Sequence, residues 1–240
     1  MGKMSRMRFS PVALTQAALM VSAVIPSSVV SAQALNRTLD EGTFLISRNG
    51  APIGRESFRI TYSQVSGINE SYRATAQVAM GDRRIVPTLT CDSTGAPLSY
   101  DVSVQGGPDG VRLQARGRPG RFSSMLRTRD GESTREYVVP RGVVVLDDDV
   151  LHQLYFVTLR RRSGSLSILA PRAGLQATAS LEERGGGPVD IAGNSIAATH
   201  FVLSAAGFAR REFWIDSAGR ILKVSIPERG IVAQRDEPPR

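Results

Sequence analysis

From Gly42 onward, hydrophobic and polar residues alternate with a period of two, and turn residues interrupt the alternation at short intervals. Successive side chains of a strand point to opposite faces, so this rhythm is typical of an antiparallel sheet with one buried face. The longest run, from Tyr72 to Met80, keeps five hydrophobic residues in register, which is hard to obtain by chance. The pattern therefore restricts the chain to an all-β fold class.

Turn residues divide the chain into hairpins. Asn49-Gly50 is a strong signal for a tight two-residue hairpin. The segments 92–95 and 216–219 each begin with Asp and end with Gly, as type I turns do. Pro87 lies inside the strand expected at 83–91. Because proline cannot donate to a ladder, that strand is predicted to lie at an edge or to carry a bulge at Pro87.

One segment departs from the period of two. Three acids at 147–149 precede an apolar run at 150–159, and three arginines follow at 160–162. Acids before a helix and cations after it complement the helix dipole, and Asp is a preferred N-cap. These features predict a helix at about 148–160 that is apolar on most sides and lies in the hollow of a curved sheet. A hydrophobic central strand is the alternative.

The first 34 residues have the organisation of a cleavable secretory signal peptide. Lys3, Arg6 and Arg8 precede an apolar stretch at 11–25, and Ala32-Gln33-Ala34 offers a small-x-small cleavage site. Cleavage is expected after Ala32 or Ala34. A membrane anchor is the alternative, but the apolar stretch is shorter than the roughly 20 residues that span a bilayer.

The signal peptide implies export to the periplasm or the extracellular space. No cysteine lies near the cleavage site, which excludes a bacterial lipoprotein. The product is expected to be soluble, with no transmembrane segment after cleavage. Cys91 is the only cysteine, so no intramolecular disulfide forms and burial alone holds the fold. We expect one β-rich domain at 35–234 and a disordered, charged tail at 235–240.

The formal net charge is +8, and Lys occurs only at Lys3 and Lys223. Residues 111–129 contain six Arg and no acid, which is one feature of nucleic-acid binding. However, Val111, Leu113 and Ala115 alternate with polar residues there, as in a half-buried strand with a solvated face. The sequence therefore favours a structural role for this segment and no nucleic-acid partner.

The last hairpin combines a strand ending in Trp-x-Asp, a turn with Gly and a return strand of the form Arg-x-Leu-x-Val, at Trp214, Asp216, Gly219, Arg220, Leu222 and Val224. It resembles that of bacterial periplasmic half-barrel (β-clam) proteins, which include the outer-membrane lipoprotein carriers and uncharacterised exported families with the same open sheet. The resemblance implies one strongly curved antiparallel sheet wrapped around helix, with a hydrophobic hollow that accepts acyl chains or similar ligands. The carriers line their cavity with additional helices, whereas this sequence predicts one, which can fill the hollow.

Four residues are predicted to face the hollow and to contact a ligand: His152, Tyr155, Phe156 and Trp214. Trp214 is the one large aromatic that could line a pocket from a strand, although a packed position in the core is the alternative. His152 lies on an apolar helix, where a hydrogen-bonded core imidazole is the alternative. The expected ligand is a hydrophobic small molecule or lipid, and an envelope protein is the other expected partner.

The residues that could perform catalysis do not form a recognisable motif. Gly193–Ala197 approaches the Gly-x-Ser-x-Gly elbow but lacks its final glycine and its following helix. Ser195 with His200 as its base is therefore kept only as an alternative. His152, His200 and Cys91 lack the spacing of metal ligands, so no metal and no cofactor are expected.

The sequence thus predicts a non-enzymatic exported envelope protein that binds an apolar or lipid-like ligand, or a protein partner, on the concave face of its sheet. Two alternatives stay open. One is a serine-type hydrolase that uses Ser195 and His200, and the other is a structural or interaction scaffold with a filled core.

Overall fold

The computed structural model describes residues 1–2, 35–65, 69–107, 110–160 and 162–240. The predicted signal peptide at 1–34 lies outside the described residues, apart from the first two. The strands are β1 (Leu35–Arg48), β2 (Ala51–Val65), β3 (Asn69–Met80), β4 (Arg83–Asp92), β5 (Pro97–Gln105), β6 (Val111–Arg118), β7 (Arg121–Thr128), β8 (Gly131–Val138), β9 (Val144–Val145), β10 (Gly164–Ala170), β11 (Leu175–Ile191), β12 (Asn194–Ala205), β13 (Phe208–Ile215), β14 (Ile221–Ile226) and β15 (Ile231–Arg235). The helices are η1 (His152–Leu154), α1 (Tyr155–Arg160) and η2 (Pro227–Arg229).

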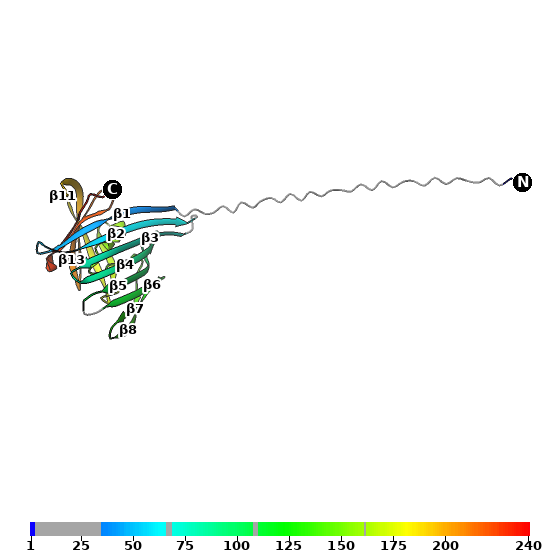
Figure 1. Ribbon diagram of the computed structural model, residues 1–240, viewed down its shortest axis with the longest axis horizontal. Helices are drawn as coiled ribbons and strands as arrows, with labels where there is room; N and C mark the ends of the chain where they lie inside the picture. The colour runs from blue at the N-terminus through cyan, green and yellow to red at the C-terminus, as the bar shows by residue number, and fades with distance from the viewer. Residues whose placement is uncertain (3–34, 66–68, 108–109, 161) are drawn as a thin grey trace. The chain divides into compact units, whose positions relative to one another are not determined.

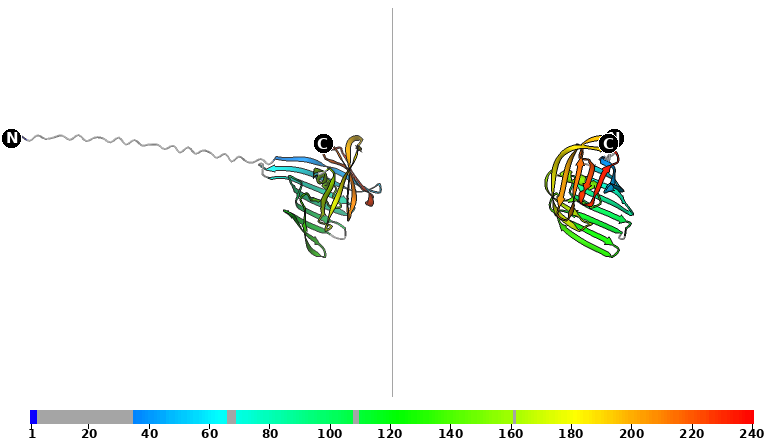
Figure 2. Two further views of the ribbon diagram at one scale, coloured as in Figure 1. Left: turned by 180° about the vertical axis from the view of Figure 1, so that it is seen from behind. Right: turned by 90° about the vertical axis from the view of Figure 1, so that its left-hand side faces the viewer.

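All these strands form a single sheet that curls without closing (Figures 1 and 2). Its order is β8-β7-β6-β5-β4-β3-β2-β1-β15-β14-β13-β12-β11-β10-β9, so β1 pairs with both β2 and β15. Every pairing is antiparallel except the short β9–β10 contact. The predicted all-β fold class, a curved antiparallel sheet around one helical segment, is confirmed.

The period of two separates a buried inner face from a solvated outer face. In β4, Ile85, Leu89 and Cys91 are each no more than 1% exposed and Pro87 is also buried, whereas the alternating residues Val86, Thr88 and Thr90 are more exposed. The tight hairpin at Asn49-Gly50 is confirmed, since both residues have the positive φ of a type I′ turn (49° and 84°). Local alternation and turn chemistry therefore place the strands and their faces.

The hollow of the sheet is occupied by residues 139–160, here called the inner segment. Its apolar side chains pack against the inner face of the sheet, and the following are each no more than 3% exposed: Val143, Val144, Val145, Leu146, Val150, Leu151, Leu154, Phe156 and Val157. The helix is shorter than the sequence predicted. A 3₁₀ turn begins at His152 and α1 ends at Arg160, while residues 148–151 are not helical.

Pro87 does not mark an edge strand, so that prediction is wrong. β4 lies between β3 and β5, and its register with β5 runs without a shift through Pro87 and Val102. The bulge lies instead at Thr90/Cys91. The β3–β4 ladder skips from the Thr75–Thr88 pair to the Val78–Ile85 pair. The missing N–H of proline falls in that gap, and pairing with β5 keeps the strand inside the sheet.

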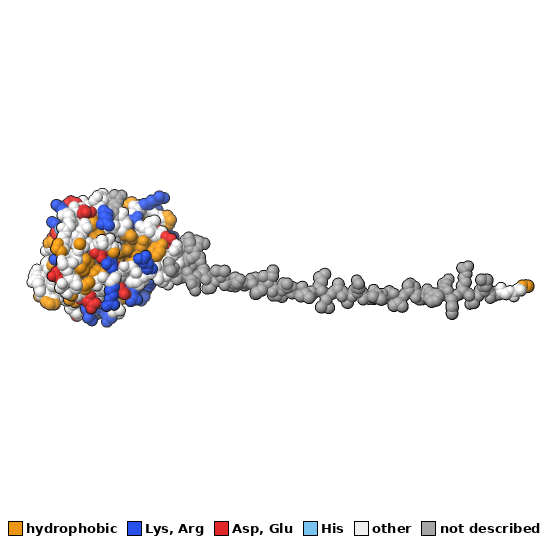
Figure 3. All heavy atoms as spheres, turned by 90° about the horizontal axis from the view of Figure 1, so that it is seen from above, with side chains coloured by type: hydrophobic (Ala, Val, Ile, Leu, Met, Phe, Trp, Pro, Cys, Tyr) orange, Lys and Arg blue, Asp and Glu red, His pale blue; other side chains and the backbone are white. Residues whose placement is uncertain are grey.

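The arginine-rich stretch at 111–129 forms half-buried strands, as predicted. Leu113 and Ala115 of β6 are fully buried, and three of the six arginines pair with acids of neighbouring strands. Examples are Arg116 with Asp101 at 2.8 Å and Arg121 with Glu136 at 2.6 Å. Acidic and basic side chains are also interspersed on the face in Figure 3.

The expected disordered tail does not begin at Arg235. This residue closes β15, is 3% exposed and binds buried Asp40 through both carboxylate oxygens at 2.6 Å. Beyond it, Asp236 N donates to Thr43 O at 3.1 Å, and Arg220 donates to Arg240 O. The charged composition of the tail predicts a solvated segment. Arg235 is buried nevertheless, because it neutralises the buried Asp40 of β1.

Gly54 of β2 lies where the chain leaves no room for a side chain. A Cβ on this residue would lie 2.0 Å from Ala79 O and 2.9 Å from Met80 Cα, both backbone atoms of β3. We therefore expect Gly54→Ala to lower the free energy of unfolding by about 2 kcal/mol. Urea denaturation measures this change. Gly187→Ala on β11 is the matched control, because its Cβ would meet nothing within 4 Å. Equal effects of the two substitutions on the free energy of unfolding would contradict a steric clash at Gly54.

Candidate functional site

The helical turn of the inner segment is capped by an acid from a distant strand. Glu56 of β2 is fully buried, and its carboxylate accepts hydrogen bonds from Leu151 N at 2.8 Å and His152 N at 2.9 Å. Glu56 Oε1 also lies 2.6 Å from His152 Nδ1. The sequence predicts that the adjacent aspartates cap the helix. That prediction is wrong, because Glu56 supplies the cap. The sequence signal was an acid at an inward position of β2, between inward Gly54 and Phe58.

This acid–imidazole pair has the composition of a catalytic dyad but not its accessibility. Both side chains are 0% exposed, and His152 stacks on the Phe58 ring with centroids 5.7 Å apart. Among the described residues, His152 Nε2 has no hydrogen-bonding partner. The imidazole is closed to solvent. Its contact with Glu56 of β2 attaches the inner segment to the sheet.

The three aspartates before the helical turn bind arginines instead of capping it. Asp147 accepts from Tyr100 Oη at 2.7 Å and from Arg172 Nε at 2.9 Å. Asp149 accepts from Arg172 at 3.0 Å and from Arg83 at 3.3 Å. Burial alone would raise the pKa of Asp149, but hydrogen bonds and charge from Arg172, with Arg83, lower it below 3.8. Burial beside Asp147 raises the pKa of the Tyr100 hydroxyl.

Asp148 completes this network on the opposite half of the sheet. It accepts from Arg211 of β13 at 2.9 Å and from Arg229 of η2 at 3.0 Å. Burial lowers the pKa of Arg211, while the charge of Asp148 opposes that change. The three aspartates together therefore bind arginines of both halves of the sheet, and these ion pairs tie the inner segment to both halves.

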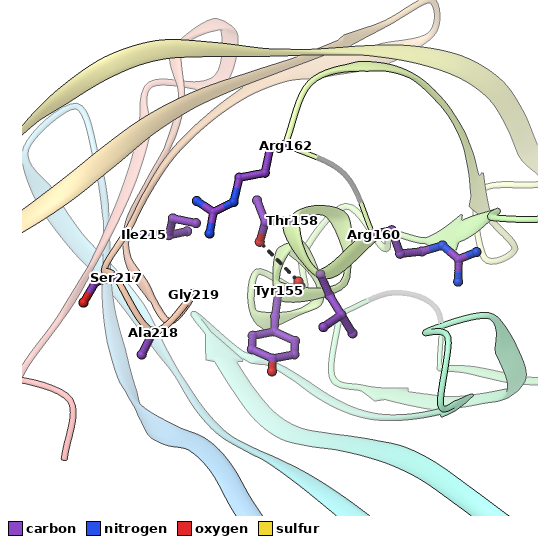
Figure 4. Close-up of a pocket in the computed structure, with 9 residues that line it drawn as sticks. Tyr155, Thr158, Arg160, Arg162, Ile215, Ser217, Ala218 and Gly219 are labelled. Atoms are coloured by element: carbon purple, nitrogen blue, oxygen red, sulfur yellow. Dashed lines mark hydrogen bonds between the residues drawn. The ribbon is translucent and has the colours of Figure 1, made fainter.

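An open cavity of about 420 Å³, here called the mouth pocket, lies between α1 and the β13–β14 turn (Figure 4). Arg162 extends across it toward Ile215, whereas Arg160 points to the other side of α1. Burial, with Tyr72 and Asp40 nearby, raises the pKa of Tyr155 to about 12, so its hydroxyl is protonated at neutral pH. The lining residues are Tyr155, Thr158, Leu159, Arg160, Arg162, Ile215, Ser217, Ala218 and Gly219. The pocket thus combines apolar walls with cations.

Of the four residues predicted to contact a ligand, Tyr155 alone lines the mouth pocket. Phe156 is 0% exposed and packs edge-on against Tyr72, with centroids 6.1 Å apart. His152 is equally buried behind it. The sequence does not predict that Arg162 and Ile215 line a common pocket. No local pattern shows that the end of the helix lies opposite the end of β13.

Trp214 does not face the hollow, and that expectation is wrong. It belongs to a small second cluster with Leu222, Val189 and Ile191, away from the main core that contains its neighbours on β13. The tip of the β11–β12 hairpin folds onto β15, where Gln234 Nε2 donates to Asp190 O at 2.6 Å. Trp214 is therefore sheltered on the outer face of the sheet.

Ser195 and His200 do not form a nucleophile–base pair. Five residues along one strand separate them by about 16 Å and place them on opposite faces. His200 stacks on Trp214 with centroids 4.4 Å apart, and its Nε2 lies 3.2 Å from Glu212 Oε2. The hydrolase alternative thus loses its proposed base.

Within the described ranges, no cluster of three His, Cys, Asp or Glu side chains could hold a metal ion. None of the helices described there could cross a membrane, since the longest, α1, has six residues.

No family model matches the chain, and no curated protein matches it. Among solved structures, the chain is similar to a β-barrel-like protein of the domain of unknown function DUF1849 from Brucella abortus. The two share 11% identity over 83% of this chain and 93% of that one, with a TM-score of 0.40.

Proposed function

We propose that this is an exported, non-enzymatic cell-envelope protein that binds an amphiphilic anion in the mouth pocket. The ligand has an apolar body and a carboxylate or phosphate group. The export part of the proposal depends on the signal peptide expected at 1–34. The inner segment fills the hollow, where the sequence predicted a binding site. We therefore place the proposed binding site in the mouth pocket, at the end of α1.

The proposal rests on the lining of this pocket, which combines apolar side chains with an arginine that forms no ion pair with a described residue. Tyr155, Leu159 and Ala218 supply apolar surface, and Arg162 has no carboxylate partner among the described residues. A guanidinium binds carboxylate and phosphate with two parallel hydrogen bonds. A cavity of about 420 Å³ also lies within the range of small-molecule sites.

Dodecanoate binding, measured by calorimetry, tests the proposal. We expect Arg162→Gln to weaken dodecanoate binding about tenfold, because one charged hydrogen-bonding partner is lost. Dodecanol, which lacks the charge, should bind both forms equally. Thr158→Trp should abolish binding of both compounds, because the larger side chain fills the pocket.

Ser195→Ala, which is remote from the mouth pocket, is the control and should bind as the unmodified protein does. Absence of measurable dodecanoate binding by the unmodified protein would refute the proposal. Equal loss of acid and alcohol binding in Arg162→Gln would show that the arginine acts only through packing.

An interaction scaffold is the second candidate, favoured by the exposed edge strand β8. All residues of β8 except Tyr137 are exposed, and β8 has a strand neighbour on one side alone. On the other side, Arg135 donates to Gly174 O at 2.8 Å and Gln176 donates to Val138 O at 2.9 Å. A protein partner can add a strand to such an edge. Light scattering of the purified protein tests for self-association through it.

A further inference from the structure

Large exposed hydrophobic side chains gather at one end of the half-barrel. In the described residues from 35 onward there are five, of which Leu98, Val138 and Leu159 are 45%, 74% and 40% exposed. Leu98 follows the β4–β5 turn, against which α1 ends: a Cβ on Gly95 would lie 3.4 Å from Leu159 Cδ2. Val138 pairs with Arg121 at the same end of the strands.

Arginines without carboxylate partners occupy the same end. Arg118, Arg141, Arg160 and Arg162 form no ion pair with any described residue, whereas many other arginines of the sheet are paired. Arg160 donates to Thr94 O of the β4–β5 turn. We call this surface, formed by the four arginines with Leu98, Val138 and Leu159, the basic end.

Two cavities open at the basic end, and Arg160 lies between them. One is the mouth pocket. The other, also of about 420 Å³, is lined by Arg141 with Ser165 and Ser167 of β10. Among the described residues, no acidic side chain lines either cavity. A negatively charged surface can therefore approach the two cavity openings without meeting a carboxylate in their walls.

We propose that the basic end docks on an anionic membrane surface. Cations attract acidic headgroups, and neighbouring apolar side chains enter the boundary between headgroups and acyl chains. A nucleic-acid backbone offers no comparable site for the three apolar side chains. The proposal goes beyond ligand binding, and it would place the opening of the mouth pocket at the lipid surface.

Vesicle flotation tests the docking surface. The protein is expected to float with vesicles of phosphatidylcholine and phosphatidylglycerol in equal parts and to bind much less to phosphatidylcholine alone. Binding should fall between about 50 mM and about 500 mM salt because ions screen the attraction. The double variant Arg118→Glu/Arg141→Glu should lose at least about tenfold in binding to the acidic vesicles.

The double variant Arg48→Glu/Arg55→Glu is the matched control. Both arginines are exposed, form no ion pair with a described residue and lie near the β1–β2 turn at the other end of the strands. Leu98→Ser/Val138→Ser should weaken binding by a factor that salt does not change. Equal losses in the control and in Arg118→Glu/Arg141→Glu would overturn the proposal, as would equal binding to both kinds of vesicle or to neither.

Neither Arg118 nor Arg141 lines the mouth pocket, so dodecanoate binding should survive their replacement. Failure of docking and failure of the proposed ligand site are therefore distinguishable. The circular dichroism melting curve of each variant verifies that a loss of flotation does not reflect unfolding.

Discussion

Glu56→Ala is expected to lower the free energy of unfolding by about 3–5 kcal/mol, one of the two largest effects of any single substitution predicted here. The substitution leaves the amides of Leu151 and His152 and the imidazole Nδ1 of His152 without an acceptor in a buried site. It also opens a cavity beneath the inner segment. Urea denaturation followed by circular dichroism measures the loss.

Glu41→Ala is the matched control for Glu56→Ala. Glu41 lies on the neighbouring strand β1 and pairs with Arg59 at 2.8 Å, but both side chains are more than half exposed. Such surface pairs contribute about 0–1 kcal/mol. Similar losses for the two variants would mean that Glu56 does not hold the inner segment. Glu56→Gln, which keeps the volume and one carbonyl acceptor, should fall between them.

Arg235→Met is expected to cost about 3–5 kcal/mol, because it leaves the Asp40 carboxylate buried without its cation. Arg235 also donates to Glu41 O at 3.0 Å and to Ile221 O at 2.5 Å, and its guanidinium lies 5.1 Å from the centroid of the Phe58 ring. The double variant Asp40→Leu/Arg235→Met removes both charges. It should recover more than half of the loss in urea denaturation, since a buried ion pair can be replaced by apolar groups.

The pH dependence of Arg235→Met has a defined sign. Burial raises the pKa of Asp40 above 3.8, although Arg235 opposes the change. The folded protein therefore takes up this proton at a higher pH than the unfolded chain does, so this group adds stability as the pH falls toward 3.8. Without Arg235 the pKa rises further, and the deficit of Arg235→Met should be smaller near pH 4 than at pH 7. A deficit that grows on acidification would contradict this account.

Asp149 contributes a pH dependence of stability with the opposite sign. Although burial opposes it, Arg172 lowers the pKa of Asp149 below 3.8, so its contribution is present above 3.8 and is lost as the pH falls through the lowered value. In the unmodified protein the two carboxyls thus partly offset each other on acidification. Denaturation midpoints of Arg172→Met across the same pH range separate the two contributions.

The sequence predicts the strands and their faces well, because alternation and turn residues act locally. It fails where a partner lies far along the chain. The acids at 147–149 have the pattern of a helix N-terminus, yet Glu56, 95 residues before Leu151, supplies the cap. Nothing local distinguishes an aspartate that caps a helix from one that binds an arginine of another strand.

The position of Trp214 shows a second limit. Phe213 and Ile215 occupy the inner face, so the period of two places Trp214 on the outer face. The sequence analysis nevertheless assigned it to the hollow, because a large aromatic residue was expected to be buried inside. The folded-back tip of the β11–β12 hairpin supplies a second sheltered surface, which no pattern within β13 shows.

The pairing of β1 with β15 also determines when the fold can be completed. Strands β1 to β8 join sequential neighbours and can assemble as a meander while the chain emerges, but β1 waits for a strand about 190 positions later. Until β15 arrives, the inner face of the early strands stays open and able to aggregate. We therefore expect slow, chaperone-sensitive folding, in which the pairing of β15 with β1 completes the middle of the sheet.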